Sequence, residues 1–236
     1  AGLNRGELMV GHGPQAAGAK PARRSVCGTP VHNPRMDAHP SDLTREIAAV
    51  AARYVVEDGM EYGPAKRQAG HQLGLSAKAP WPDNLVMEAA VREYIAVFCP
   101  DSQAAELQAL REQALVWMDR LQDFQPHLGG AVWHGTATRH SDIHLHLFCD
   151  DPKAAELSLL GHRVDYQPGS ATGWRGEPVD ALTLRSRNAA LGQWVLVHLL
   201  VHDHDGLRGA LKPDALGRKP RGDAKALRAL LAAGSH

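Results

Sequence analysis

The fold of this 236-residue chain is decided by the stretch Gly135-Thr136-Ala137-Thr138-Arg139-His140-Ser141-Asp142-Ile143-His144-Leu145-His146-Leu147. From residue 142 onward, polar and apolar side chains alternate strictly. This pattern predicts a β-strand, because successive side chains of a strand point to opposite faces of the sheet. The apolar face would enter a core, and it carries Ile143, Leu145 and Leu147. The polar face would line a surface or cleft, and it carries Asp142, His144 and His146.

A short apolar segment that ends in a glycine and a hydroxyl residue precedes this strand. Val132 and Trp133 lead to Gly135 and Thr136. Glycine allows a backbone to approach a phosphate closely, and successive backbone N–H groups of a turn can bind an anion. Followed so soon by Ser141-Asp142, the Gly-Thr pair predicts a phosphate-binding turn beside a strand that carries metal ligands.

The pattern resembles the DNA-polymerase-beta-type nucleotidyltransferase superfamily, in the form of a small bacterial nucleotidyltransferase domain. The family's motif is an apolar residue and Gly-Ser, then a loop, then Asp-x-Asp or Asp-x-Glu on the next strand. A third carboxylate comes from a later strand. The resemblance covers the chain from about residue 130 to residue 202. It implies two magnesium ions, which bind a nucleoside triphosphate and activate an acceptor hydroxyl for attack on its α-phosphorus.

The resemblance implies roles for six residues. Those expected to bind the nucleotide are Gly135, Thr136 and Ser141. Those expected to hold metal and act in catalysis are Asp142, His144 and Asp180. Asp142 matches the first carboxylate of the motif, and Asp180 is the choice for the third over Asp165 and Glu177.

The chain departs from the family's pattern at two points. His144 stands where the second carboxylate belongs, and the gap between Gly135 and Asp142 is short for the family. Magnesium prefers oxygen ligands, so imidazole is a poor replacement. The resemblance implies Mg²⁺ or Mn²⁺ as the divalent cation. With His144 in place of a carboxylate, the site would use a softer ion such as Mn²⁺ or Zn²⁺, hold a single metal, or have stopped catalysing.

Two functions follow, and the motif favours the enzyme. The first is a metal-dependent nucleotidyltransferase that moves a nucleoside monophosphate from a triphosphate to a hydroxyl of a small molecule, RNA or protein. The alternative is a catalytically degenerate protein of the same fold, which acts as a nucleotide-binding, regulatory or interaction module. The missing second carboxylate at His144 is the observation behind this alternative.

Fourteen histidines suggest a third function, a histidine-rich metal-binding hydrolase. His198 and His202 share one face of an expected strand, and His204 follows. With His144 and His146 they could form an imidazole-rich pocket for a transition metal. Their spacing fits no closed zinc motif, so ordinary surface histidines remain the simpler interpretation.

The order of the periodic segments predicts an α+β protein, with an N-terminal helical region followed by a nucleotidyltransferase-like mixed β-sheet with flanking helices. We expect a disordered segment at 1–40, helices at 41–125, the α/β domain at 126–205 and a polar tail at 206–236. Helices are expected from a cap at Ser41 or Asp42, from Pro64, from a cap at Asp83 or Asn84, from Asp101 or Ser102, from Pro152 to Leu160 and from Ala224 to Ala232. Strands are expected at 131–133, 142–148, 163–166, 179–184 and 194–202.

Composition limits the partners and the compartment. Twenty-six basic and 26 acidic residues give zero formal charge, so nucleic acid gains no support from a global field. A short basic run, from Lys212 to Lys225, is more typical of a solvated tail than of a nucleic-acid site. The odd number of cysteines, three, favours reduced thiols in the cytoplasm. No apolar run approaches the ~20 residues of a membrane helix, so no membrane partner is expected.

Overall fold

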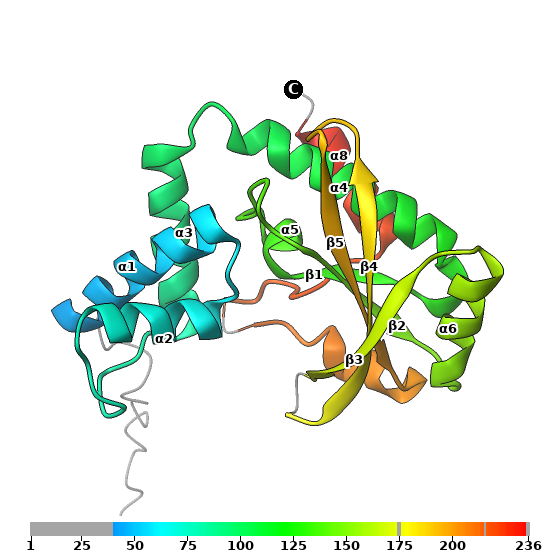
Figure 1. Cartoon of the computed structure of the whole chain (residues 1–236), viewed down its shortest axis with the longest axis horizontal. Coiled ribbons are helices and arrows are strands. Elements are labelled where there is room, and N and C mark those ends of the chain that lie inside the picture. The colour runs from blue at the N-terminus through cyan, green and yellow to red at the C-terminus, as the bar shows by residue number, and fades with distance from the viewer. Residues whose placement is uncertain (1–39, 174–175, 215, 235–236) are drawn as a thin grey trace, which may run out of the picture. The chain divides into compact units, whose positions relative to one another are not determined.

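In the computed structural model, which describes residues 40–173, 176–214 and 216–234, three helices form the first packed group (Figure 1). They are α1 (Asp42–Asp58), α2 (Tyr62–Gln72) and α3 (Asn84–Phe98). The side chains of Ser41 and Asp83 cap α1 and α3 by accepting backbone N–H groups of the first turn. All three expected helices are confirmed. The segment expected to be disordered lies, except for Pro40, outside the described residues.

Small residues bring α1, α2 and α3 close together. The centre of this group consists largely of alanines with little or no exposed surface: Ala48, Ala51, Ala52, Ala65 and Ala69. Ile47, Met87 and Val91 fill the space between the helices and are fully buried. The helical region therefore has an apolar core of its own.

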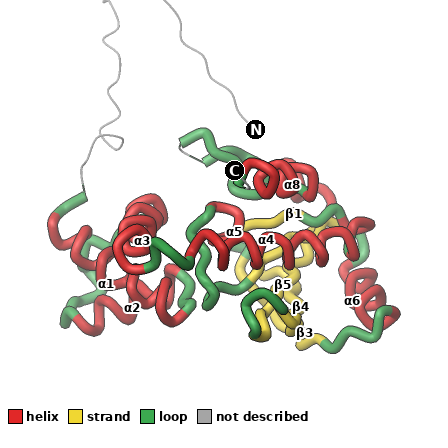
Figure 2. The backbone as a smooth tube through the Cα atoms, turned by 90° about the horizontal axis from the view of Figure 1, so that it is seen from above, coloured by secondary structure: helices red, strands yellow, loops and turns green. Residues whose placement is uncertain are grey.

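The fourth helix, α4 (Gln103–Arg120), packs against the sheet (Figure 2). Its apolar residues belong to the core of the sheet half: Leu110, Ala114, Trp117 and Met118. The indole N–H of Trp117 donates to the Ser186 hydroxyl across 2.8 Å, which satisfies a polar group at the edge of that core. The sequence placed this helix in the N-terminal region, whereas its contacts place it with the sheet.

Five strands form one mixed sheet in the order β1-β2-β5-β4-β3. They are β1 (His127–Gly129), β2 (Ile143–Phe148), β3 (Tyr166–Thr172), β4 (Pro178–Asn188) and β5 (Gln193–His202). The central strands β2 and β5 are parallel, and the other neighbours are antiparallel. The expected α+β architecture, helices followed by a mixed sheet with flanking helices, is confirmed.

The two faces of the sheet differ in character. One face is apolar and is covered by α4, α6 (Pro152–Gly161) and α8 (Ala224–Ala233), which contribute to the same core. Its strand residues are Ile143, Leu145, Leu147, Leu182, Leu184, Val195, Val197, Leu199 and Val201. The other face carries the polar side chains, because His144 pairs with His198, and His198 with Thr183, in the strand register. We call it the polar face.

Two strand predictions were wrong in detail. Residues 131–133 lie in a short helix, α5 (Gly130–His134). A glycine with a positive φ stands at each end of this helix, Gly130 (66°) and Gly135 (83°). A three-residue apolar run carries no usable periodicity, so strand and helix could not be separated there. The strand expected at 163–166 begins only at Tyr166 and continues to Thr172.

The C-terminal segment returns to the sheet. After η2 (His204–Gly206) and α7 (Leu207–Ala210), the backbone of Gly222 bridges to Leu128 of β1, and α8 follows as expected. The Trp133 indole donates to the Lys219 carbonyl across 2.8 Å. These contacts hold part of the expected polar tail against α5. Across the ranges that the structure describes, no helix is both long and apolar enough to span a membrane.

Candidate functional site

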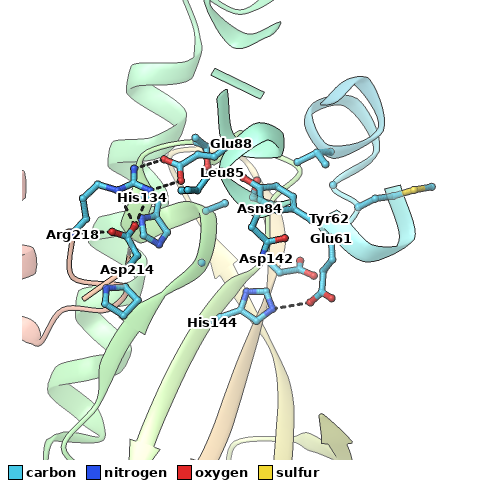
Figure 3. Close-up of a pocket in the computed structure, with 18 of the residues that line it drawn as sticks. Glu61, Tyr62, Asn84, Leu85, Glu88, His134, Asp142, His144, Asp214 and Arg218 are labelled. Carbon is cyan, nitrogen blue, oxygen red and sulfur yellow. Dashed lines mark hydrogen bonds and ion pairs between the residues drawn. The ribbon is translucent and has the colours of Figure 1, made fainter. Parts of the chain in front are cut away.

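A cavity of about 550 Å³ lies between the helices α1–α3 and the polar face of the sheet (Figure 3). Its walls combine apolar and polar side chains from segments far apart in the chain. The apolar part includes Val55, Met60, Leu85, Ala131, Leu200 and Pro220. The polar part includes Glu61, Glu88, Asp142, His144, Asp214 and Arg218. This size and this mixture are typical of small-molecule sites.

One wall carries a carboxylate–imidazole pair, and a hydroxyl group is hydrogen-bonded to the other nitrogen of the imidazole. The Asp142 carboxylate lies 3.2 Å from Nε2 of His198, and Nδ1 of His198 lies 2.9 Å from the Thr183 hydroxyl. If Nε2–H donates to Asp142, Nδ1 is left to accept from Thr183. The side chains of Asp142 and His198 are 35% and 24% exposed, and Asp142 lines the cavity with His198 behind it.

A second carboxylate–imidazole pair lies beside the first. Nε2 of His144 lies 3.4 Å from a Glu61 oxygen, and the His144 ring stacks on the His198 ring with centroids 4.9 Å apart. The hydrogen bond from His144 lowers the pKa of Glu61. Glu61 comes from the start of α2 and is 73% exposed, whereas His144 is 27% exposed. Figure 3 shows Glu61, Asp142 and His144 grouped together.

The opposite wall carries an ion-pair network that joins α3 to the C-terminal segment. Arg218 donates to both oxygens of Glu88, at 2.7 and 2.8 Å, and also to Asp214 at 3.0 Å (Figure 3). Arg92 donates to the same Glu88 at 2.9 Å. These arginines hold the pKa of Glu88 down at about 2. Because the charges are paired with one another, this wall offers little free charge to an ionic ligand.

Deeper in the polar face, a second pair of histidines is buried. Nδ1 of His146 lies 3.0 Å from Nε2 of His202, and the two rings stack at 5.2 Å. Burial lowers the pKa of His146 well below its usual value, and burial together with Arg221 lowers the pKa of His202 to about 4. We call this the inner pair, and His144 with His198 the outer pair.

The glycine turn does not present free backbone donors to the cavity. The N–H groups of Gly135 and Thr136 both donate to the Ala131 carbonyl, at 2.9 and 3.0 Å. Thr136 lines the cavity but is only 2% exposed, and its side chain is hydrogen-bonded to Tyr62. The prediction that Gly135 and Thr136 cradle a phosphate is therefore wrong for this geometry, because α5 already uses their N–H groups.

The loop between the turn and β2 is tied to neighbouring helices. The Thr138 hydroxyl donates to the Val56 carbonyl of α1 at 3.1 Å, and the Arg139 N–H donates to Glu106 of α4 at 2.9 Å. Ser141 lines the cavity and accepts the Thr138 N–H at 3.0 Å. The short spacing from Gly135 to Asp142 thus forms a connection braced by two helices.

Asp180 lies far from the other predicted metal ligands. It pairs with Val201 in the strand register, and Val201 pairs with Leu147, so Asp180 is on the face opposite to Asp142 and His144. It is exposed and lies near Lys153 of α6. The predicted ligand set of Asp142, His144 and Asp180 is therefore wrong, because a one-residue shift along a strand moves a side chain through the sheet.

The remaining side chains do not restore a metal centre. Within the described ranges, no three His, Cys, Asp or Glu side chains form a group that could hold a metal ion. The Nε2 atoms of the outer pair are engaged by Asp142 and Glu61. The residues present do not fit the two-magnesium site that the resemblance implied. Of the alternative imidazole-rich pocket, the strands do bring His144 beside His198 and His146 beside His202, but as two pairs and not as one ligand group within the described ranges.

Several site residues could not be found from the sequence. Glu61, Glu88 and Arg218 come from helices and a loop far from the motif strand, and only the tertiary fold brings them to the cavity. The sequence grouped His198 and His202 with His144 and His146, but it did not give the pairing of His198 with His144. The signal available was the alternation in Val197-His198-Leu199, which matches Ile143-His144-Leu145. Two such segments on adjacent strands can place their polar residues side by side.

Comparisons with known proteins add nothing to this geometry. A search against models of protein families and a search of curated proteins found no match to the chain. What the fold defines is a class, an α+β protein with helices followed by a five-stranded mixed sheet and a cavity on the polar face of that sheet.

Proposed function

We propose that the chain binds a nucleotide-sized organic molecule in the cavity, as a binding module on a nucleotidyltransferase-like fold that lacks the two-metal site. The observation that carries the proposal is the outer pair. His144 and His198 stand side by side on the two central strands, and the resemblance requires a carboxylate at the position of His144. Nucleotides are the first ligands to test, because the motif around Asp142 resembles a family that binds them.

The small number of carboxylates on the polar face is the reason to propose binding ahead of two-metal transfer chemistry. Charge that builds on a transferring phosphoryl group is offset by a metal pair, which needs several anionic oxygen ligands. Asp142 supplies one carboxylate, and Asp180 is behind the sheet. Glu61 brings a second carboxylate to the cavity, but it is largely exposed and engaged with His144. Metal-dependent transfer of a nucleoside monophosphate to a hydroxyl acceptor stays a prediction.

The cavity itself supports binding. Its volume of about 550 Å³ falls within the range of small-molecule sites, and apolar side chains make up much of its wall. Asp142, His144 and Glu61 supply convergent polar groups on one side. A flat aromatic ring between Leu85 and Ala131 could donate and accept hydrogen bonds along this polar wall.

Calorimetry with the purified full chain tests the proposal. ATP, GTP, CTP and UTP are titrated, each with MgCl₂ and again with EDTA. We expect at least one to bind, with a dissociation constant that EDTA changes by less than about twofold. Failure of all four nucleotides under both conditions would refute the proposal.

A cavity-filling variant locates the binding. Leu85→Trp adds bulk at the cavity wall and should weaken binding at least about tenfold. Leu157→Trp is the matched control, because Leu157 is 64% exposed on α6 and should leave binding unchanged. Equal effects of the two variants would place the nucleotide outside the cavity.

A second candidate is metal-free acid–base catalysis, which the two carboxylate–imidazole pairs favour. An imidazole oriented by a carboxylate is the usual arrangement for moving a proton to or from a bound molecule. Bound nucleotide is incubated in EDTA, and its hydrolysis is followed in wild type and in His198→Gln. Hydrolysis that falls at least about 100-fold in the variant supports catalysis. Transfer that needs Mg²⁺ or Mn²⁺ and is lost in Asp142→Ala would support the transferase.

A further inference from the structure

The polar face continues beyond the cavity as an exposed patch at the β4–β5 hairpin. The patch consists of Arg185 and Arg187 on β4 and of Trp194 and Leu196 on β5, and we call it the hairpin patch. Arg187 pairs with Trp194, and Arg185 with Leu196. Since His198 follows two residues after Leu196, the hairpin patch and the outer pair lie on the same face.

The exposure of this patch is unusual for its residue types. Trp194 is 54% exposed and Leu196 is 36% exposed, whereas Val195 between them is 3% exposed. Further along the same face, burial increases until Leu200 is only 8% exposed. The polar face is thus open at the hairpin and covered at the far end. An exposed tryptophan beside an exposed leucine marks a surface for interaction.

The patch is also positively charged without compensation. The Arg185 guanidinium lies 5.4 Å from the centre of the Trp194 ring. Arg139 brings a further positive charge to the same end of β5, since its guanidinium lies 3.5 Å from the side-chain oxygen of Gln193. Within the part of the chain that the structure describes, Arg139, Arg185 and Arg187 form no ion pair, in contrast to Arg218 and Arg228.

We propose that the hairpin patch binds single-stranded nucleic acid. Stacking of a base on an aromatic side chain is tolerant of sequence, and arginines attract the phosphates on either side. Arg185 beside the Trp194 ring adds a planar cation on which a base can also stack. An acidic protein partner would match the charge alone, whereas the exposed indole together with unpaired arginines matches a chain of alternating bases and phosphates.

The hairpin patch is in line with the cavity along β5. Trp194, Leu196 and His198 are alternate residues of β5, so the ring of Trp194 lies on the order of 13 Å from His198 along the strand. A nucleic acid stacked on Trp194 could therefore extend toward Asp142 and the cavity. This inference goes beyond the proposed function, and binding at the patch does not require a ligand in the cavity.

Fluorescence anisotropy with the full chain and a labelled single-stranded 12-mer tests the inference. We expect saturable binding at 50 mM salt that weakens strongly at 200 mM salt. Trp194→Ala should weaken binding about 5- to 100-fold through lost stacking. The double variant Arg185→Gln/Arg187→Gln should weaken binding about tenfold and reduce the slope of log K against log salt by about 1.4.

Matched variants separate the patch from general charge and from the cavity. Arg45→Gln/Arg228→Gln removes the same charge from ion pairs on α1 and α8 and should leave binding within about twofold of wild type. Leu85→Trp should abolish mononucleotide binding and spare the 12-mer, so the two proposals fail separately. No binding at 50 mM salt, or an equal loss in the Arg45/Arg228 variant, would overturn the inference. Equal binding of polyglutamate and the 12-mer, insensitive to Trp194→Ala, would overturn it in favour of an acidic protein partner.

Discussion

The outer and inner histidine pairs lie on the same two strands and have opposite surroundings. In each pair the rings stack nearly parallel, at 4.9 Å in the outer pair and 5.2 Å in the inner pair. Each outer histidine has a carboxylate partner, and His144 lines the cavity. The inner histidines bond to each other, are buried, and have Arg221 nearby. Two residues along a strand therefore separate histidines bonded to carboxylates from histidines held neutral.

Physical chemistry explains the difference. A carboxylate beside an imidazole favours the charged ring, whereas burial and a nearby guanidinium favour the neutral ring. A hydrogen bond between two imidazoles also needs at least one of them neutral, because one nitrogen must accept. Residue type alone thus says little about a histidine-rich face. The neighbours from other elements, such as Glu61 and Arg221, decide its chemistry.

The largest expected effect is acid destabilisation through the inner pair. The pKa of His202 is lowered to about 4 in the folded protein, chiefly by burial and next by Arg221, while Glu177 and Asp203 act in the opposite direction. Below pH 6.5 the unfolded chain takes up a proton that folded His202 does not, so stability falls as pH drops. Between pH 7 and pH 4, His202 alone should remove about 3 kcal/mol from the free energy of unfolding. Urea denaturation at both pH values measures the loss.

Two variants connect this loss to the inner pair. His202→Gln removes the titrating group. The loss of unfolding free energy between pH 7 and pH 4 should therefore be about 3 kcal/mol smaller in this variant than in wild type. His204→Gln, at an exposed neighbouring position, should retain the wild-type dependence. If His202→Gln shows the full wild-type dependence, the inner pair is not held neutral, and the contrast between the pairs is lost.

The next effect concerns the ion pairs on the far wall of the cavity. Glu88→Gln should lower the free energy of unfolding at pH 7 by about 2 kcal/mol, because Arg218 and Arg92 lose a carboxylate that is 11% exposed. The pKa of Glu88 is about 2, below the 4.5 of the free side chain, so its contribution is complete above pH 4.5 and is lost as pH falls toward 2. Urea denaturation of wild type and variant at pH 7 measures it. An unchanged stability would show that the network does not join α3 to the C-terminal segment.

A smaller effect tests the outer pair. Asp142→Asn keeps the shape but removes the charge that orients His198, so nucleotide binding should weaken about tenfold, equivalent to about 1.4 kcal/mol. Stability should change by less than about 0.5 kcal/mol, since Asp142 is partly exposed. Calorimetry and urea denaturation give the two values. A large loss of stability with unchanged binding would make Asp142 a structural residue.

The parts of the fold that could be predicted have strong local signals. The alternation from Asp142 to Phe148 gave β2 and the correct face for every side chain, and capping residues such as Ser41 and Asp83 gave helix starts. The helix α5 was missed because three apolar residues fit strand and helix equally well. The strand β3 was misplaced because it holds Pro168 and Gly169, which are uncommon in strands.

The candidate site could be predicted only where it is local. Asp142, His144, Thr136 and Ser141 all line the cavity, as the motif strand suggested. The predicted phosphate-binding role of Gly135 does not fit the structure, because the hydrogen bonds of a turn depend on the helix before it and the sequence did not predict α5. Glu61, Glu88 and Arg218 reach the site through tertiary packing, which no spacing within one segment encodes.

The smallest expected effect is that of Asp180, and it separates the observed register from the one that a metal site requires. Asp180→Ala should change the free energy of unfolding by less than about 0.5 kcal/mol and leave nucleotide binding unchanged, since the side chain is exposed on the face opposite to the cavity. Asp142→Asn, at the matched position on the polar face, should weaken binding in the same titration. If Asp180→Ala weakened binding as much, and only with Mg²⁺ present, the two carboxylates would share a cation. The pairing of Asp180 with Val201 would then have to shift by an odd number of residues, because only such a slip carries its side chain through the sheet to the polar face that holds His144.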